Sequence, residues 1–392
     1  VSIPSGGAAA YYGVKAEDYI TTGDGSVTNP YNASAVQNAI NALSSRGGIV
    51  FVKAGVWSGG TRINVGGTVS GLKRRVYIIG EGSNQFYADD DGGAGAPNFV
   101  GTHIRAGFDC YVPTHFEHVT VSPAPGQEAT APAIKYILDP VIISDLHRWL
   151  GGFEVKDVAI SGGNPGIHMT GVNMPSWPDT WQIWKILMER VHFQECVTGL
   201  KIDKGDAPGS AGLLECVFRG LEFRWSSGRA IDIQVENWGG EMSDVLVEGG
   251  SGGQAYAIFI STFGTGGLKL NNWSMGDGNN STKDAFLEFG RGAVVDNFTF
   301  TKDVDIAGGG YYRLGRLFGT GVANFTSGEA VKLEAMHGHS LALGTITNPA
   351  KVLIILGPDA VGFIGSSTLG ASPATYTNND SYIENVMLVG GT

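Results

Sequence analysis

Apolar and polar residues alternate in short segments that return along the chain at a nearly constant interval. A typical segment opens with Gly or Ala and then alternates, as in Gly166-Ile167-His168-Met169. Such alternation predicts strands with one buried face, and a period of about 20–50 residues is typical of stacked repeat units. The first row of apolar anchors is Ile167, Leu200, Ile231 and Ile258, spaced by 33, 31 and 27 residues. The pattern predicts a solenoid with Met169, Ile202, Ile233 and Ile260 facing inward and His168, Lys201, Asp232 and Phe259 facing outward.

A second row of apolar anchors runs beside the first at a similar spacing. It comprises Val158, Val191, Leu221, Val245, Trp273, Phe298 and Phe325. Most of these are preceded by Asp or Asn, which tolerate turn conformations and can hydrogen-bond the backbone of neighbouring coils. We therefore predict turns at Asp157, Asp244, Asn272, Asn297, Asn324 and Asn385. The sequons at Asn272, Asn297 and Asn324 fall on this row, so the better glycosylation candidates are Asn32, Asn280 and Asn379.

Helical periodicity is found only near the start of the chain. Residues 32–45 place Val36, Ala39, Ile40 and Leu43 on one face, with Asn32 as the expected N-cap and Gly47-Gly48 as the stop. A solenoid exposes its core at an open end, and a short amphipathic helix can cover it. We expect an N-terminal extension over residues 1–22 and a single domain over 23–392, with no capping helix recognisable at its last coil.

The segment around this helix resembles the pectate lyase superfamily, also described as pectin-lyase-like proteins. The resemblance rests on Gly23-Asp24-Gly25, the helix, the strand after Gly47-Gly48, the turn Lys53-Ala54-Gly55-Val56-Trp57 and the next coil at residues 76–83. It implies an all-β fold, a single-stranded right-handed parallel β-helix with a short N-terminal capping α-helix. Because that superfamily includes polysaccharide lyases, glycoside hydrolases, viral tailspikes and surface proteins without known activity, the fold does not choose the function.

Composition and net charge limit the classes of binding partner and the cellular location that we expect for the protein. The chain has 392 residues, 61 of them Gly without a triplet period, and a net charge of −11, which makes nucleic acid an improbable general partner. No apolar stretch is long enough to span a membrane. The first residue is Val1, which fits a mature secreted protein at an extracellular, cell-surface or virion-surface location. We expect Cys110, Cys196 and Cys216 to be buried thiols, with a Cys196–Cys216 disulfide as the alternative.

The richest set of candidate catalytic side chains lies on the outward positions of the first row. On stacked strands, Asp203 and Asp232 would be diagonal neighbours at roughly 8 Å, within the ~6.5–9.5 Å carboxyl separation of inverting glycosidases. Alternatively, His168, Lys201 and Arg229 could neutralise a uronate and supply the base of a β-elimination. Asp206 and Glu236 would add substrate contacts. The same charges would also suit the solvated face of any soluble β-helix.

Other motifs carry weaker predictions. His337 and His339 partly match the Gly-His-Gly segment of polygalacturonases, and two exposed turn histidines are the simpler interpretation. The acidic run at residues 89–91 could offer oxygen ligands to Ca²⁺, but it lacks the EF-hand spacing, so no metal ligands or cofactor are assigned. Three tryptophans form the densest aromatic cluster, either stacking on sugar rings or packing a long loop. These are Trp177, Trp181 and Trp184.

Three classes of function remain open from the sequence. The first is a secreted polysaccharide lyase or glycoside hydrolase that uses an outward face as a long flat groove. The second is a tailspike or adhesin that binds glycan on the same face. The third is a structural subunit of a filament or surface layer, which an uncovered last coil would favour because exposed strand edges invite self-association.

Overall fold

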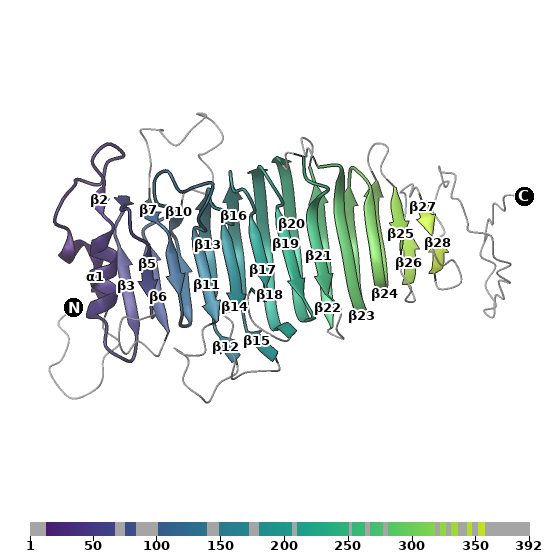
Figure 1. Cartoon of the computed structure of the whole chain (residues 1–392), viewed down its shortest axis with the longest axis horizontal. Helices are drawn as coiled ribbons and strands as arrows, with labels where there is room; N and C mark the ends of the chain where they lie inside the picture. The colour runs from purple at the N-terminus through teal and green to yellow at the C-terminus, as the bar shows by residue number, and fades with distance from the viewer. Residues whose placement is uncertain are drawn as a thin grey trace, which may run out of the picture.

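The strands stack into one long parallel solenoid. In the computed structural model, 28 strands belong to a single sheet, and the pairings between them are parallel throughout the described residues. Figure 1 shows the coils following one another along the long axis from the N-terminus. The expected parallel β-helix with an N-terminal helix is therefore confirmed. The structure describes residues 13–66, 75–83, 101–138, 149–171, 180–205, 210–250, 253–262, 267–276, 281–317, 322–326, 331–335, 343–346 and 352–356.

Each full coil contributes to three ladders of paired strands, called here faces A, B and C. Face A contains β1 (Gly13–Lys15), β3 (Gly48–Val52), β6 (Val76–Gly80), β9 (Thr114–Glu117), β26 (Val331–Ala335) and β28 (Val352–Leu356). Face B contains β2 (Tyr31–Asn32), β4 (Gly55–Ser58), β7 (Thr102–Ala106) and β10 (Thr120–Pro123). Four longer strands bend from face A into face B: β13 (Glu154–Ser161), β16 (Leu187–Gln194), β20 (Asn237–Gly250) and β22 (Leu268–Met275). A fifth, β18 (Ser210–Ser226), does the same.

Face C carries the first row of anchors. It contains β5 (Ile63–Val65), β8 (Phe108–Cys110), β11 (Ile134–Leu138), β14 (Ile167–Gly171), β17 (Leu200–Asp203), β19 (Ile231–Val235), β21 (Tyr256–Thr262), β25 (Ala323–Phe325) and β27 (Leu343–Ile346). Two long strands, β23 (Lys283–Phe300) and β24 (Val304–Leu317), begin on face C and continue through face A into face B. A short side ladder joins β12 (Trp149–Gly151) and β15 (Thr180–Trp184) to the starts of β18 and β20.

The register of face C matches the spacing of the first row. Ile167 pairs with Leu200, Leu200 with Ile231, and Ile231 with Ile258. The predicted inward residues Met169, Ile202, Ile233 and Ile260 are fully buried. Because side chains alternate across a strand, their neighbours are held on the outside at strand spacing.

The second row is confirmed along most of its length, and its turns follow the expected chemistry. Val158, Val191, Leu221, Val245, Trp273 and Phe298 are successive register partners. The residues before them occupy the corner between faces A and B in the left-handed region, where Asn and Asp are favoured. The φ angles of Asp157, Asp244, Asn272 and Asn297 lie between 52° and 57°. Asn272 donates to Asp244 at 2.7 Å and Asn297 to Asn272 at 3.0 Å, so the corner side chains connect coil to coil.

The last predicted member of the row, Phe325, lies on a different face. Phe298 pairs with Leu314, whereas Phe325 pairs with Ile306 on face C. Asn324 is accordingly a strand residue that donates to Asp305 at 3.0 Å, not a corner residue. The prediction was wrong here because an Asn before an inward Phe occurs on both faces at nearly the same spacing. Asn385 lies outside the described residues.

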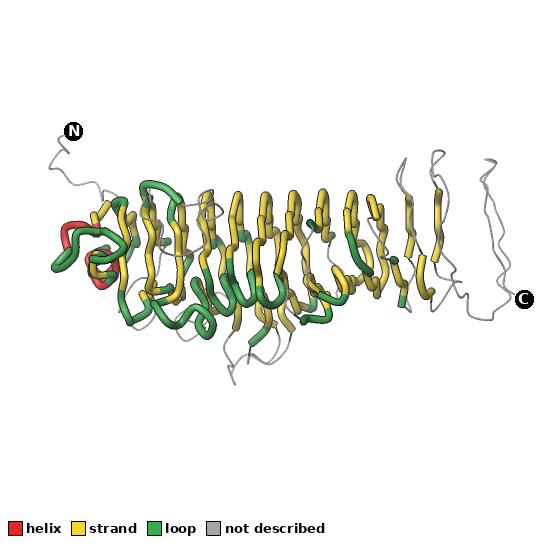
Figure 2. The backbone as a smooth tube through the Cα atoms, turned by 90° about the horizontal axis from the view of Figure 1, so that it is seen from above, coloured by secondary structure: helices red, strands yellow, loops and turns green. Residues whose placement is uncertain are grey.

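The capping helix is shorter than expected and begins differently. Helix α1 (Ser34–Ala42) buries Val36, Ala39 and Ile40 against the first coil, at one end of the solenoid. Figure 2 shows the helix across this end of the stack. Asn32 is not the N-cap, because it belongs to β2 and its Oδ1 accepts bonds from the backbone of Thr21 and Thr22 instead. A 3₁₀ helix, Ala16–Tyr19, precedes it.

The interior is a continuous apolar core with thiols in it. Cys110, Cys196 and Cys216 are buried and free, so the alternative of a Cys196–Cys216 disulfide was wrong. Burial raises the pKa of the Cys216 thiol to about 12. Residues 13–15, which the sequence assigned to an extension, form β1 and pair with β3. Within the described residues, no helix has the length and apolar character needed to cross a membrane.

Candidate functional site

An uninterrupted column of outward side chains runs along face C. Register pairing joins ten of them, one per coil, at the strand spacing of ~4.8 Å. The column passes from charged side chains near its start to aromatic side chains further on. Its members are Asn64, Asp109, Lys135, His168, Lys201, Asp232, Phe259, Phe286, Asp305 and Asn324. We call this column and the outward residues beside it the C strip.

Asp203 is the centre of the charged half of the C strip. Its carboxylate accepts from His168 Nε2 at 3.2 Å, Thr170 Oγ1 at 2.9 Å and the Gly205 backbone at 3.0 Å, and it pairs with Lys201 Nζ at 3.0 Å. Burial raises the pKa of Asp203, but the bonds and charges of His168 and Lys201 outweigh it, so the pKa lies well below its usual range. Asp203 is therefore an ionised carboxylate with its acceptor sites occupied.

Asp232 and Arg229 form the next pair along the C strip. Arg229 NH1 bonds Asp232 Oδ2 at 3.0 Å, and Gln234 Nε2 bonds Oδ1 at 2.8 Å. The Arg229 guanidinium lies 4.4 Å above the Phe259 ring, and its Nε is buried with no hydrogen-bond partner among the described residues. Lys201 pairs in register with Asp232 and Asp203 with Gln234, which makes the two aspartates diagonal neighbours as the sequence predicted.

Of the remaining predicted site residues, some lie within the described part of the chain and others lie outside it. Glu236 is exposed between β19 and β20. Trp184 is partly exposed at the end of β15, and Trp181 lies in the same strand. The side-chain amide of Asn32 donates to Ser34 at 2.9 Å. Outside the described residues lie Asp206, Trp177, Asn280, Asn379, His337, His339 and residues 89–91.

The sequence pattern did not identify the aromatic half of the C strip as a candidate site. Phe259 and Phe286 stack with ring centroids 4.9 Å apart and planes 13° apart. Tyr256 lies beside both rings at 6.2 and 5.5 Å, inclined by about 55°. All three side chains are partly exposed. The signal was present in the alternation, because Phe259 and Phe286 occupy outward positions where polar residues are usual.

A buried carboxylate fixes the tyrosine of this half. Tyr256 OH donates to Asp305 Oδ2 at 2.6 Å. Asp305 lies two coils from Tyr256 towards the C-terminus, one coil beyond Lys283, the register partner of Tyr256. Lys283 Nζ pairs with both oxygens of Asp305, at 2.7 and 2.8 Å. Burial raises the pKa of Asp305, but Lys283, Tyr256 and Asn324 outweigh it, and the pKa lies below the ordinary value. Burial and the Asp305 carboxylate raise the pKa of Tyr256 to about 12.

The Asp305→Asn replacement is expected to lower the Tyr256 pKa from about 12 towards the ordinary value of 10.0. The shift should be partial, because burial is the larger cause and remains. A raised pKa means that the neutral phenol stabilises the fold below pH 10, and that this contribution is lost as the pH rises through 12. The pKa of Tyr256 is measured from the phenolate absorbance during an alkaline titration, after subtraction of the same titration of the Tyr256→Phe protein. An unchanged transition would contradict the role of Asp305.

Histidine–carboxylate pairs also occur on the other two faces. On face A, His115 lies 2.9 Å from Glu154 and 3.0 Å from Glu117. On face B, His192 lies 3.1 Å from Glu222. Pairing of this kind between coils therefore does not distinguish face C. Among the described residues, the stacked and partly exposed pair of Phe259 and Phe286 does.

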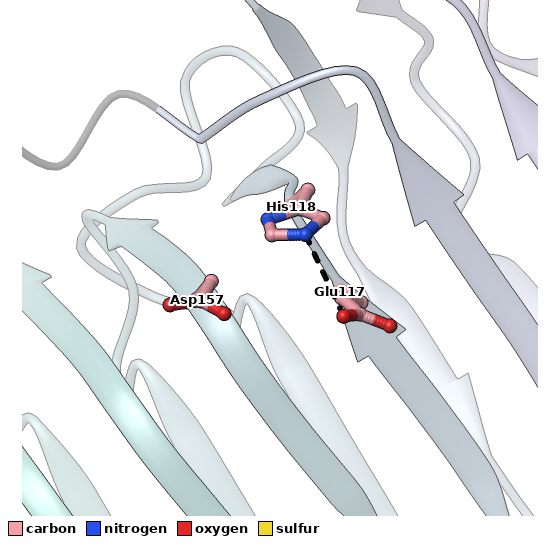
Figure 3. A group of neighbouring side chains, drawn as sticks. All are labelled: Glu117, His118 and Asp157. Atoms are coloured by element: carbon pink, nitrogen blue, oxygen red, sulfur yellow. Dashed lines mark ion pairs between the residues drawn. The ribbon is translucent and has the colours of Figure 1, made fainter.

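One group of side chains at the corner of faces A and B has the composition of a metal site. Ligand atoms of Glu117, His118 and Asp157 lie within 4.8 Å of one another. Figure 3 shows the three side chains as neighbours at this corner. Asp157, however, is already held by both arms of Arg190, at 2.5 and 2.9 Å, and this hydrogen-bonded pair lowers the pKa of the carboxyl. The guanidinium already supplies the positive charge that a cation would bring.

Comparison with known proteins leaves the family open. No protein-family model and no curated protein matches the chain. A solved structure described as ORF18 of Geobacillus virus E2 is 14% identical over 83% of this chain, with a TM-score of 0.45, and this chain covers 62% of that protein's length. The catalytic unit of a GH87 alpha-1,3-glucanase from Streptomyces thermodiastaticus is 11% identical over 93% of this chain and 71% of its own, with a TM-score of 0.29. Neither likeness shows a family, and the assignment of the parallel β-helix rests on the strand pairing.

Proposed function

We propose that the protein is a secreted, carbohydrate-active member of the pectate lyase superfamily that binds an extended polysaccharide along the C strip and cleaves it. One observation carries the proposal: the C strip presents an unbroken, register-locked series of charged and then aromatic side chains across successive coils. An extended chain lying along the solenoid axis would meet a new side chain at every coil. Repetition at strand spacing suits a polymeric ligand better than a compact one.

The charged half offers two routes to cleavage. In hydrolysis, one carboxyl protonates the leaving oxygen and another activates water. The ionised Asp203 suits the second role or electrostatic stabilisation, which leaves proton donation to another group. In elimination from a uronate, Lys201, Arg229 and His168 would neutralise the sugar carboxylate while a base removes the adjacent proton.

Incubation with neutral and uronic polysaccharides, following both unsaturated product and new reducing ends, tests the proposal. Unsaturated product identifies elimination, and reducing ends without unsaturation identify hydrolysis. The Asp203→Asn and Asp232→Asn proteins are expected to lose activity by at least about a hundredfold, the usual contribution of acid–base groups. Asp244→Asn is the matched control, because asparagine tolerates the same corner conformation. Equal activity in all three variants would remove the charged half from the reaction.

A second candidate is a glycan-binding or structural protein without activity, such as a tailspike, adhesin or filament subunit. The observation that favours it is that neighbouring donors already bond both carboxylate oxygens of Asp203 and of Asp232. Carboxylates held in this way are common on all three faces, where they join coils. Binding without cleavage of any polysaccharide would support this candidate, and particle size in solution would separate monomer, trimer and filament.

A further inference from the structure

We propose that Tyr256, Phe259 and Phe286 form a subsite for an uncharged sugar ring of the polysaccharide, an inference that rests on the proposed function. The three side chains come from β21 and β23, next to each other on face C. They interrupt a column that is polar before and after them. Sugars combine an apolar C–H face with hydroxyl groups, and partly exposed aromatic rings bordered by polar groups match both properties.

The rings are held in place before any ligand arrives. Phe259 is stacked between Phe286 at 4.9 Å and the Arg229 guanidinium at 4.4 Å. Tyr256 is tethered at its hydroxyl to Asp305, so its ring spans coils at an angle of about 55° to both phenylalanines. Because the phenylalanines cover each other's faces, the sugar contacts the Tyr256 ring and their outward edges. A surface fixed in this way loses little conformational entropy on binding.

Charge at the subsite selects against an acidic sugar. Two cations, Arg229 and Lys283, stand against three carboxylates, Asp232, Asp305 and Glu288, which gives a local charge of −1. Both cations are already paired with the aspartates. A uronate carboxylate would therefore meet net repulsion here, while a neutral pyranose would not.

Glu288 supplies hydrogen bonds to the sugar hydroxyls. Its Oε2 accepts from Ser261 Oγ at 2.6 Å, and within the described part of the chain no cation pairs with it. Its register partners on the adjacent coils are the small residues Ser261 and Ala307, which leave the carboxylate partly exposed next to Phe286. A carboxylate accepts strongly from hydroxyl groups, so Glu288 orients the sugar that the rings hold.

Calorimetric titration of the 392-residue chain with neutral hexose oligosaccharides and with oligogalacturonates tests the subsite. Neutral oligosaccharides are expected to bind the wild type, and Tyr256→Ala and Phe286→Ala to weaken that binding about tenfold, the upper range for an aromatic contact. Tyr256→Phe keeps the ring and should retain most of the affinity. Phe51→Ala is the matched control, since Phe51 is 42% exposed on face A. Equal affinity of the Tyr256→Ala, Phe286→Ala and Phe51→Ala proteins would overturn the subsite.

A second measurement has its main readout on the wild-type protein, so it does not depend on whether the alanine variants fold. Saturation-transfer NMR on the wild type should pass magnetisation from aromatic protons to sugar protons, and Tyr256→Phe with Phe286→Leu should alter the pattern. Binding of acidic oligosaccharides alone, or neutral binding with no aromatic transfer, overturns the subsite and leaves the proposed function standing. Absence of binding by every oligosaccharide and polysaccharide tested overturns both.

Discussion

Replacement of Phe223 by alanine is expected to lower the free energy of unfolding by about 3–5 kcal/mol. Phe223 is 1% exposed and stacks inside the solenoid on Phe193, with ring centroids 4.5 Å apart and planes 9° apart. Its removal leaves a cavity that the flanking coils cannot close, because each is fixed by backbone pairing on three faces. Denaturant unfolding followed by circular dichroism measures the loss.

The outward phenylalanine stack provides the control for this experiment. Phe259 and Phe286 have nearly the same stacking geometry, at 4.9 Å and 13°, but are partly exposed. Phe259→Ala should therefore lower the free energy of unfolding clearly less than Phe223→Ala. The Phe259 ring buries less apolar area on folding, and its removal leaves no closed cavity. Equal losses in the two variants would show that ring stacking, and not interior packing, dominates.

The tightness of the interior is visible at a neighbouring glycine. A Cβ added to Gly199 would lie 2.5 Å from both Phe223 Cδ1 and the Ala230 carbonyl oxygen. The glycines that open the first-row segments at positions 166 and 199 thus make room for an inner side chain and for the backbone of the next coil. The repeated small residue at these positions has a packing cause, which the sequence displays but cannot by itself reveal.

The sequence predicts the fold well because register in a solenoid is set locally. A one-residue slip would turn Met169 and Ile202 outward, so alternation alone determines which residues pair. It fails where two faces carry the same signature, as at Phe325, whose preceding Asn324 looks like a corner residue and is a strand residue. It fails again at Asn32, whose side-chain oxygen accepts from the preceding loop instead of capping the helix backbone, while its amide donates to Ser34.

The candidate site is less predictable, because its properties come from contacts between distant positions. The diagonal relation of Asp203 and Asp232 follows from register and was predicted. The tether from Tyr256 to Asp305 crosses 49 positions and skips a coil, and no periodic pattern contains it. The saturation of Asp203 likewise depends on donors from two coils and a turn.

Replacement of Asn272 by alanine is expected to lower the free energy of unfolding by about 2–5 kcal/mol. Asn272 donates to Asp244 and accepts from Asn297, and two such bonds contribute about 0.5–1.5 kcal/mol each. Its φ is 56°, and a residue with a Cβ but no polar side chain pays a further ~1–2 kcal/mol in the left-handed region. Thermal and denaturant unfolding measure the sum.

Two further variants separate the backbone and hydrogen-bond contributions at this corner. Asn272→Gly removes the same two bonds but accommodates the conformation, so it should cost less than Asn272→Ala by the backbone share. Asn271→Ala removes an exposed neighbour that lies on the strand outside the corner column, and should change stability by less than about 0.5 kcal/mol. If Asn272→Ala and Asn272→Gly lower the free energy of unfolding equally, the left-handed corner carries no backbone strain. The contribution of Asn272 would then come from its side-chain hydrogen bonds alone. If neither costs more than Asn271→Ala, the corner column does not hold the coils together, and their stability comes from backbone pairing and the apolar interior.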